Sequence, residues 1–214
     1  MQVSNARVAL GIVSVQGRPV VIRSNASVAY TSIHYEPFVL LTGASGAGKT
    51  TIARSVEKLR LTNCEVHFFD SIGVPSVEQM RKEYGPGYEP GGTWQRAMTL
   101  LWMRRIRTIL DCGTSVLLEG QMRISFIREA LAESQISSAR ILLLDCDDIT
   151  RAERLKVHRL QPDLANSDMM NWARYLREEA HAAQIRVLDT GRLSVAKCVD
   201  VIVAHLLDGQ PVSS

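Results

Sequence analysis

The segment Gly43 to Thr50 carries the clearest chemical signal in the chain. It reads Gly-Ala-Ser-Gly-Ala-Gly-Lys-Thr and fully matches the pattern G-x-x-x-x-G-K-[ST]. Glycines let successive backbone N–H groups turn inward around an anion, and a helix starting here adds the positive end of its dipole. Lys49 supplies a mobile cation and Thr50 a hydroxyl ligand for Mg²⁺. The segment therefore predicts a site for a polyphosphate chain with its magnesium ion.

Nine residues are expected to contact this polyphosphate. They are Gly43, Ala44, Ser45, Gly46, Ala47, Gly48, Lys49, Thr50 and Thr51. For Thr51 the alternative is an ordinary residue in the first turn of the helix.

The elements that must position this segment are short apolar runs alternating with longer helical patterns. The expected strands are 38–41, 65–69, 115–119, 140–145 and 185–189. The expected helices are 48–60, 76–84, 94–111, 123–134, 148–160, 168–183 and 194–207. This alternation is typical of an α/β protein with a parallel sheet, in which ligands bind at the carboxyl ends of the strands.

Residues 1–36 differ in texture from the rest of the chain. Apolar residues alternate on both sides of a turn signal at Gln16 and Gly17, which indicates an appended β-hairpin or a loose extension. We expect the main domain to span 37–209 and a short tail to span 210–214.

Composition excludes several classes of protein. The 214 residues are 46% hydrophobic and 22% charged, which is typical of a globular domain. The formal net charge of +3 is too small to argue for a polyanionic partner. The four cysteines lie far apart and indicate neither a zinc site nor a disulfide framework. Together with the lack of a long apolar run, this predicts a cytoplasmic protein that does not bind a membrane.

Further segments follow the phosphate-binding segment in a recognisable order. Asp70 follows the second strand, Leu-Leu-Glu-Gly ends the third at 117–120, Arg-Ala-Glu-Arg-Leu-Lys-Val-His-Arg follows the fourth at 151–159, and Leu-Asp-Thr-Gly-Arg-Leu-Ser covers 188–194. Over residues 38–207 this order resembles the P-loop small-molecule kinases, including nucleoside monophosphate, shikimate, gluconate and adenylylsulfate kinases. The resemblance implies a three-layer α/β fold, a five-stranded parallel sheet in the order 2-3-1-4-5 and a short helical lid.

The resemblance also implies roles on the acceptor side. Asp70 would orient or deprotonate an acceptor hydroxyl, whereas the alternative makes it a turn former. Glu119 would hold the hydration shell of Mg²⁺, with Glu standing where many relatives have Asp. Arg123 stands where nucleotide kinases use an arginine on phosphate, although the proline that usually precedes it is absent, and the alternative is a solvated residue at a helix start.

The segment 151–159 resembles the entry to a kinase lid. On an α-helix Arg151, Arg154 and His158 share one face, with Arg159 at its margin. Lid arginines stabilise the charge of a transferring phosphoryl group, so Arg154 and Arg159 join Lys49 as expected catalytic residues. The alternative is a solvated basic face.

The resulting prediction is an ATP- and Mg²⁺-dependent kinase that phosphorylates a small molecule, as a monomer or homodimer. The alternative is a P-loop NTPase that couples hydrolysis to a macromolecular partner. A nucleic-acid-binding module is not favoured, because the arginines at 104, 105 and 107 lack interleaved aromatic residues.

Overall fold

A computed structural model of the chain describes residues 10–15, 18–23, 37–85, 91–137 and 139–207. The chain divides into two units, Met1–His34 and Tyr35–Ser214. In the first unit, β1 (Leu10–Val15) and β2 (Arg18–Arg23) pair antiparallel. The turn at 16–17 and the tail at 210–214 lie outside the described residues.

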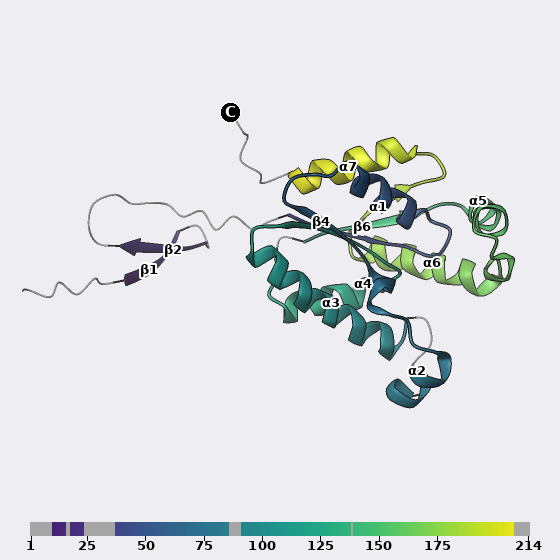
Figure 1. Cartoon of the computed structure of the whole chain (residues 1–214), viewed down its shortest axis with the longest axis horizontal. Coiled ribbons are helices and arrows are strands. Elements are labelled where there is room, and N and C mark those ends of the chain that lie inside the picture. The colour runs from purple at the N-terminus through teal and green to yellow at the C-terminus, as the bar shows by residue number, and fades with distance from the viewer. Residues whose placement is uncertain (1–9, 16–17, 24–36, 86–90, 138, 208–214) are drawn as a thin grey trace, which may run out of the picture. The chain divides into compact units, whose positions relative to one another are not determined.

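The second unit is built on a five-stranded sheet of parallel strands in the order β4-β5-β3-β6-β7 (Figure 1). The strands are β3 (Phe38–Thr42), β4 (Cys64–Phe68), β5 (Ser115–Glu119), β6 (Ala139–Asp145) and β7 (Arg186–Asp189). Counted along this unit, the order is 2-3-1-4-5, so the expected topology is confirmed. β3 and β5 are buried along their whole length, because helices cover both faces of a parallel sheet.

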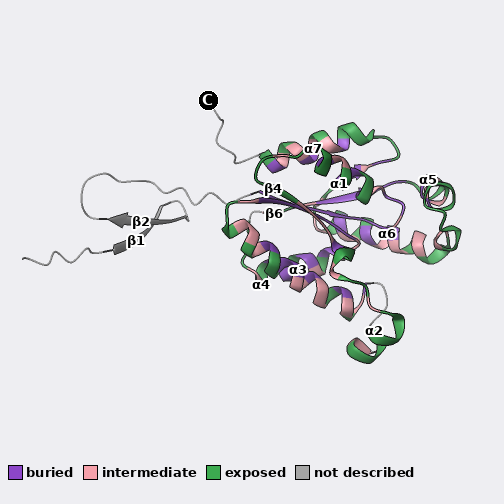
Figure 2. Ribbon diagram, viewed as in Figure 1, coloured by how far each residue is buried: buried purple, intermediate pink, exposed green. Residues whose placement is uncertain are grey.

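Helices cover both faces of this sheet, as Figures 1 and 2 show. The α-helices are α1 (Lys49–Lys58), α2 (Val77–Tyr84), α3 (Thr93–Asp111), α4 (Ile124–Glu133), α5 (Asp148–Glu153), α6 (Ser167–Ala182) and α7 (Val195–Leu207). Alternation along β3 divides the core: Val39 and Leu41 pack with α1 and α7, whereas Phe38 and Leu40 pack with α3 and α4.

The prediction of one α-helix over 148–160 is wrong in its second half. α5 ends at Glu153 and continues as a π-helical turn, Arg154–His158, followed by a short 3₁₀ turn, Pro162–Leu164. The remaining helices begin and end within about two residues of their expected bounds. Among the described helices, none combines the length and the apolar character that a membrane span requires.

Candidate functional site

The segment between β3 and α1 forms a loop closely packed on the sheet. Gly43 has a φ of 152°, and a Cβ there would lie 2.3 Å from the carbonyl oxygen of Leu144 in β6. Gly46 and Gly48 have φ values of 81° and 88°, in the left-handed region that favours glycine. Gly48 is also the N-cap of α1 and has no side chain to occupy the helix N-terminus. The loop therefore has the backbone conformation that an anion-binding turn requires.

Lys49 lies at the floor of this loop and is only 8% exposed. Its Nζ donates a hydrogen bond to the carbonyl oxygen of Ala44 at 3.2 Å. The pKa of Lys49 is lowered to about 8, chiefly by burial; Arg159 and Arg151 contribute to this shift, and Glu119 and Asp70 oppose it. The ammonium group is therefore held with less solvation than it needs, and a phosphate would supply the missing negative charge.

Thr50 and Glu119 bring two oxygen atoms together beside Lys49. The Thr50 hydroxyl donates to Glu119 Oε1 at 3.0 Å, and Glu119 is buried at the carboxyl end of β5. Burial raises the pKa of Glu119, while Lys49 and the Thr50 hydrogen bond oppose that shift. Among the described residues no group of three or more His, Cys, Asp or Glu could hold a metal. A hydroxyl and one carboxylate suit Mg²⁺, which usually keeps waters and phosphates as its other ligands.

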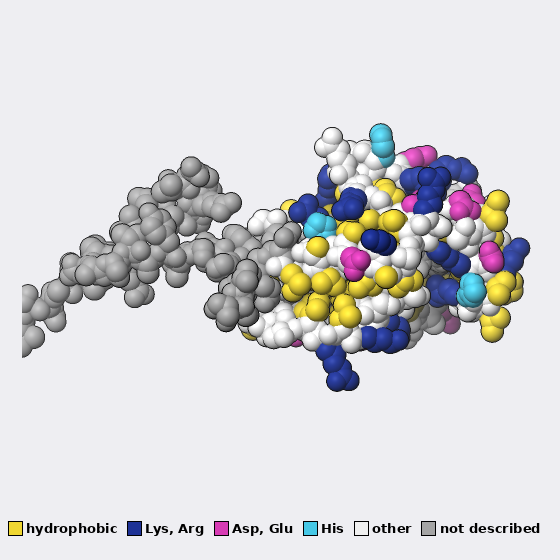
Figure 3. Space-filling view, turned by 90° about the horizontal axis from the view of Figure 1, so that it is seen from above, with side chains coloured by type: hydrophobic (Ala, Val, Ile, Leu, Met, Phe, Trp, Pro, Cys, Tyr) yellow, Lys and Arg dark blue, Asp and Glu magenta, His cyan; other side chains and the backbone are white. Residues whose placement is uncertain are grey.

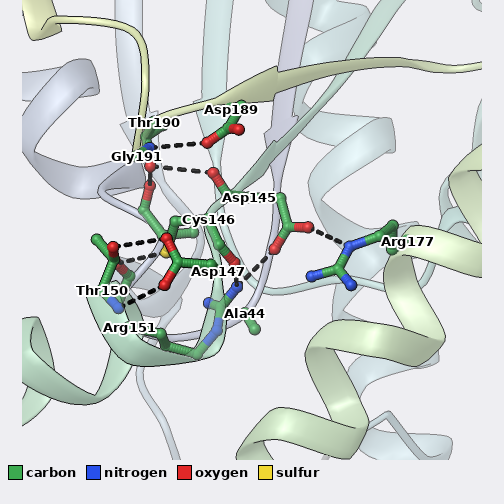
Figure 4. Close-up of polar contacts among 12 residues, drawn as sticks. Ala44, Asp145, Cys146, Asp147, Thr150, Arg151, Arg177, Asp189, Thr190 and Gly191 are labelled. Atoms are coloured by element: carbon green, nitrogen blue, oxygen red, sulfur yellow. Dashed lines mark hydrogen bonds and ion pairs between the residues drawn. The ribbon is translucent and has the colours of Figure 1, made fainter.

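Arg151 supports the loop from beneath, a position that the sequence did not predict. It is fully buried, and its guanidinium donates to the carbonyl oxygen of Ser45 at 2.9 Å and to Asp145 Oδ1 at 2.5 Å. Figure 4 shows Asp145 between Arg151 and Arg177, whose Nε donates to Oδ2 at 2.6 Å. Arg151 and Arg154 therefore both face the loop, and Arg151 acts there as an internal brace because it is fully buried.

The π-helical turn places two arginines on the loop side of the lid. The amide of Arg159 bonds to the carbonyl oxygen of Arg154 at 3.0 Å, so the turn closes after five residues instead of four. Arg154 donates to the hydroxyl of Thr190 at 2.8 Å, to its carbonyl at 2.7 Å and to the carbonyl of Gly46 at 3.3 Å. In a regular α-helix Arg159 would lie about 140° away from Arg154 around the axis.

Two cavities meet at this loop. The first, of about 470 Å³, lies between the loop, the lid and the start of α7. It is lined by Gly46, Gly48, Lys49, Thr50, Thr51, Ile52, Arg54, Arg154, His158, Arg159, Thr190, Leu193, Val195 and Cys198. On the face drawn in Figure 3, Lys and Arg side chains are spread over the unit and include several at the right-hand end, where α5 lies in Figure 1.

The second cavity, of about 400 Å³, lies between the loop, α2 and the start of α3. It is lined by Ser45, Lys49, Thr50, Phe69, Asp70, Val74, Val77, Met80, Trp94, Gln95, Glu119, Gly120, Gln121 and Arg159. Among the described residues, Lys49, Thr50 and Arg159 line both cavities. A group bound at these three side chains is thus accessible from both cavities.

Asp70 and Arg123 have different surroundings. Asp70 is exposed in a 3₁₀ turn, Phe69–Ile72, and lines the second cavity. Its carbonyl also closes the turn at Gly73, and its role toward an acceptor hydroxyl stays a prediction. Arg123 is not among the described residues lining either cavity; its guanidinium lies 5.0 Å from the ring centre of Tyr175, in an aromatic cluster, and its assignment to phosphate stays a prediction.

Sequence reasoning missed Gln95 and the side chain of Thr190. Gln95 is buried in α3 and holds the segment after β5, donating to the carbonyl of Gln121 at 2.7 Å and accepting from the amide of Arg123 at 3.0 Å. Thr190 Oγ1 lies 3.0 Å from the carbonyl oxygen of Ala47 and links the last loop to the phosphate loop. In the sequence, a glutamine within a helix gives no indication that its side chain will bond to distant backbone groups.

Comparisons with known proteins agree with the fold of this unit. No protein-family model matches the sequence, and no curated protein matches it. Among solved structures, a sugar kinase from Janibacter sp. HTCC2649 has 21% identity and a TM-score of 0.61, covering 82% of this chain and 96% of its own. A shikimate kinase from Acinetobacter baumannii, in complex with shikimate, has 16% identity and a TM-score of 0.55, covering 84% and 97%. A gluconokinase from Sinorhizobium meliloti 1021 has 18% identity and a TM-score of 0.55, covering 82% and 94%. The chain therefore has the fold of the P-loop small-molecule kinases.

Proposed function

We propose that the protein transfers the γ-phosphoryl group of Mg-ATP to a hydroxyl of a small molecule. The observation that carries this proposal is the meeting of the two cavities at Lys49, Thr50 and Arg159. A nucleotide in the first cavity, with its phosphates on the loop, would present its terminal phosphate at this junction. An acceptor in the second cavity would meet it there. The kinase structures of the same fold support the assignment.

The described side chains have separate roles in the proposed reaction. Asp70 holds the acceptor hydroxyl and takes its proton as the oxygen attacks the γ-phosphorus. The bond from that phosphorus to the bridging oxygen breaks, and ADP leaves. Lys49 and Arg159 stabilise the negative charge on the phosphoryl oxygens, and Arg154 joins the lid to the loop. Thr50 and Glu119 would hold Mg²⁺, which would neutralise part of the negative charge of the phosphates.

Replacing Asp70 with asparagine tests the acceptor side. We expect the rate of transfer to fall roughly 100-fold to 10,000-fold, because the base is lost, while Mg-ATP affinity changes little. Labelled ATP and chromatography of the product measure transfer, and calorimetry measures affinity. Asp200→Asn, at an exposed site on α7 outside both cavities, is the matched control. Unchanged transfer by Asp70→Asn would remove Asp70 from the mechanism, whereas ATP hydrolysis without any phosphorylated small product would favour the coupled NTPase.

Proton uptake on nucleotide binding is a second expected result. At about pH 8.5 most Lys49 side chains are neutral in the ligand-free protein, since the pKa is about 8. A bound polyphosphate favours the ammonium form, so binding should take up a substantial fraction of one proton at pH 8.5 and little below pH 7. Calorimetry in buffers of different ionisation enthalpy measures this uptake. A proton count that stays constant from pH 7 to 9 would contradict the role of Lys49.

A further inference from the structure

The second cavity has an unusual distribution of charge for a site that would bind an acidic substrate. Among the described residues, the cations that line it are Lys49 and Arg159, and both also line the first cavity. When a triphosphate occupies the loop, these two groups face its phosphates. The remaining charged groups in the lining are the carboxylates of Asp70 and Glu119. From the described lining the acceptor therefore meets negative charge and no unengaged cation.

The described neighbouring segments add no further cation to the lining, and Arg123, two residues after Gln121, is not among the residues that line it. Residues 86–90 read Pro-Gly-Tyr-Glu-Pro and contain neither lysine nor arginine. On α2, Arg81 and Lys82 are exposed and are not among the residues that line the cavity. A carboxylate or phosphate on the acceptor would thus lose water without gaining a positive partner, and it would approach like charges.

Apolar side chains form one wall of the second cavity. Phe69 and Trp94 meet edge to face with ring centres 6.0 Å apart. Val74, Val77 and Met80 continue this wall along the segment that leads into α2 and along α2 itself. Val74 and Val77 are each 55% exposed, which leaves aliphatic surface uncovered at the side of the cavity. Such a wall gains free energy by covering an apolar body.

We propose that the acceptor is an uncharged, largely apolar or aromatic alcohol, and that hydroxy acids and phosphorylated compounds are excluded. The inference rests on the proposed kinase function and specifies its substrate class. The apolar body lies against the wall formed by Phe69, Val74, Val77, Met80 and Trp94, and the reacting hydroxyl lies at Asp70. The cavity of about 400 Å³ fits a molecule of modest size.

A ligand screen on the full chain tests the substrate class. The probes are matched sets of neutral aromatic alcohols, their carboxylic-acid analogues and neutral polyols, added to protein saturated with Mg²⁺ and a non-hydrolysable ATP analogue. Binding is followed by ligand-observed NMR, and every ligand that binds is then assayed for phosphorylation with labelled ATP. We expect neutral aromatic alcohols to bind at least tenfold more tightly than their acid analogues. A preference for acids or polyols, or the absence of any bound neutral alcohol, overturns the proposal.

A charge introduced into the wall provides the internal check. Val77→Arg should weaken the binding of neutral alcohols at least tenfold. It should also reduce or reverse the protein's preference for neutral alcohols over their acid analogues. Glu78→Gln changes the net charge by the same +1, by removing a carboxylate at an exposed position on the same helix outside the lining, and it should leave the preference unchanged. Mg-ATP affinity is measured first on each variant. Loss of this affinity indicates misfolding or a failure of the proposed function, whereas a changed preference with unchanged affinity concerns the wall alone. If both variants change the preference equally, the wall does not determine specificity.

Discussion

Replacing Lys49 with methionine is expected to abolish triphosphate binding and, at the same time, to stabilise the ligand-free protein. The pKa of Lys49 lies at about 8 instead of 10.5, because burial disfavours the ammonium form. A shift of this size corresponds to roughly 3 kcal/mol against the charged form at neutral pH. Methionine fills similar volume without a charge, so the free energy of unfolding should rise by roughly 1 to 3 kcal/mol. Calorimetry with Mg-ATP and urea denaturation at pH 7 measure the two effects.

The pH dependence of this stabilisation has a defined sign. Between about pH 8 and pH 10.5 the unfolded chain keeps its lysine proton, whereas folded Lys49 has lost it. The stability contribution of Lys49 therefore rises with pH in this window, and the advantage of the methionine variant should shrink there. Lys58→Met, at an exposed position near the end of α1, is the matched control and should change stability little. A destabilised Lys49→Met variant would show that Lys49 has a structural role instead.

Replacing Arg151 with methionine should cause the largest loss of stability. Its guanidinium is fully buried and bonded to Asp145 and to the carbonyl oxygen of Ser45. Removing one member of a buried ion pair typically costs about 3 to 5 kcal/mol, because the other charge stays buried. The loop also loses its brace, so Mg-ATP affinity should fall with stability. Chemical denaturation and calorimetry on the same preparations measure both.

Arg177 provides the comparison within the same network. It bonds to the other oxygen of Asp145 but is itself 47% exposed, so Arg177→Met should cost about 1 kcal/mol or less. Arg151→Lys keeps a positive charge and loses the planar fork, and it should fall between the two. Equal effects of the Arg151 and Arg177 substitutions would contradict a special role for the buried guanidinium.

Periodicity and motif spacing predicted the parallel sheet and most helix bounds, and the resemblance to P-loop small-molecule kinases predicted the strand order. Short apolar runs such as 38–41 and 115–119 have few alternatives to buried parallel strands, and the loop motif fixes where α1 begins. The carboxyl-edge rule then places Asp70 and Glu119 near the loop. These predictions succeed because each depends on local pattern and on one topological rule.

The arginines of the lid could not be assigned in this way. Spacing of three, four and seven residues shows which side chains share a helical face, but it does not show what that face packs against. Arg151 lies against the loop and Asp145, so it is internal, whereas Arg159 is exposed beside both cavities. Gln95 was missed for a similar reason: its partners are backbone groups more than 25 residues away. Such long-range contacts produce no periodic pattern in the sequence.

The π-helical turn affects how the chain tolerates deletions at this position. Its closure from Arg159 to Arg154 uses one residue more than an α-helical turn needs. With one residue fewer, a regular α-helical turn would also hold this arginine within about 40° of Arg154, because it would follow Arg154 by four positions instead of five. A three-nucleotide deletion within this turn would therefore keep the arginine near the junction, whereas a deletion in a regular α-helical turn would move the next side chains of the helix by about 100°. In descendants of this gene, the turn should thus tolerate the loss of one residue better than a regular helical turn does.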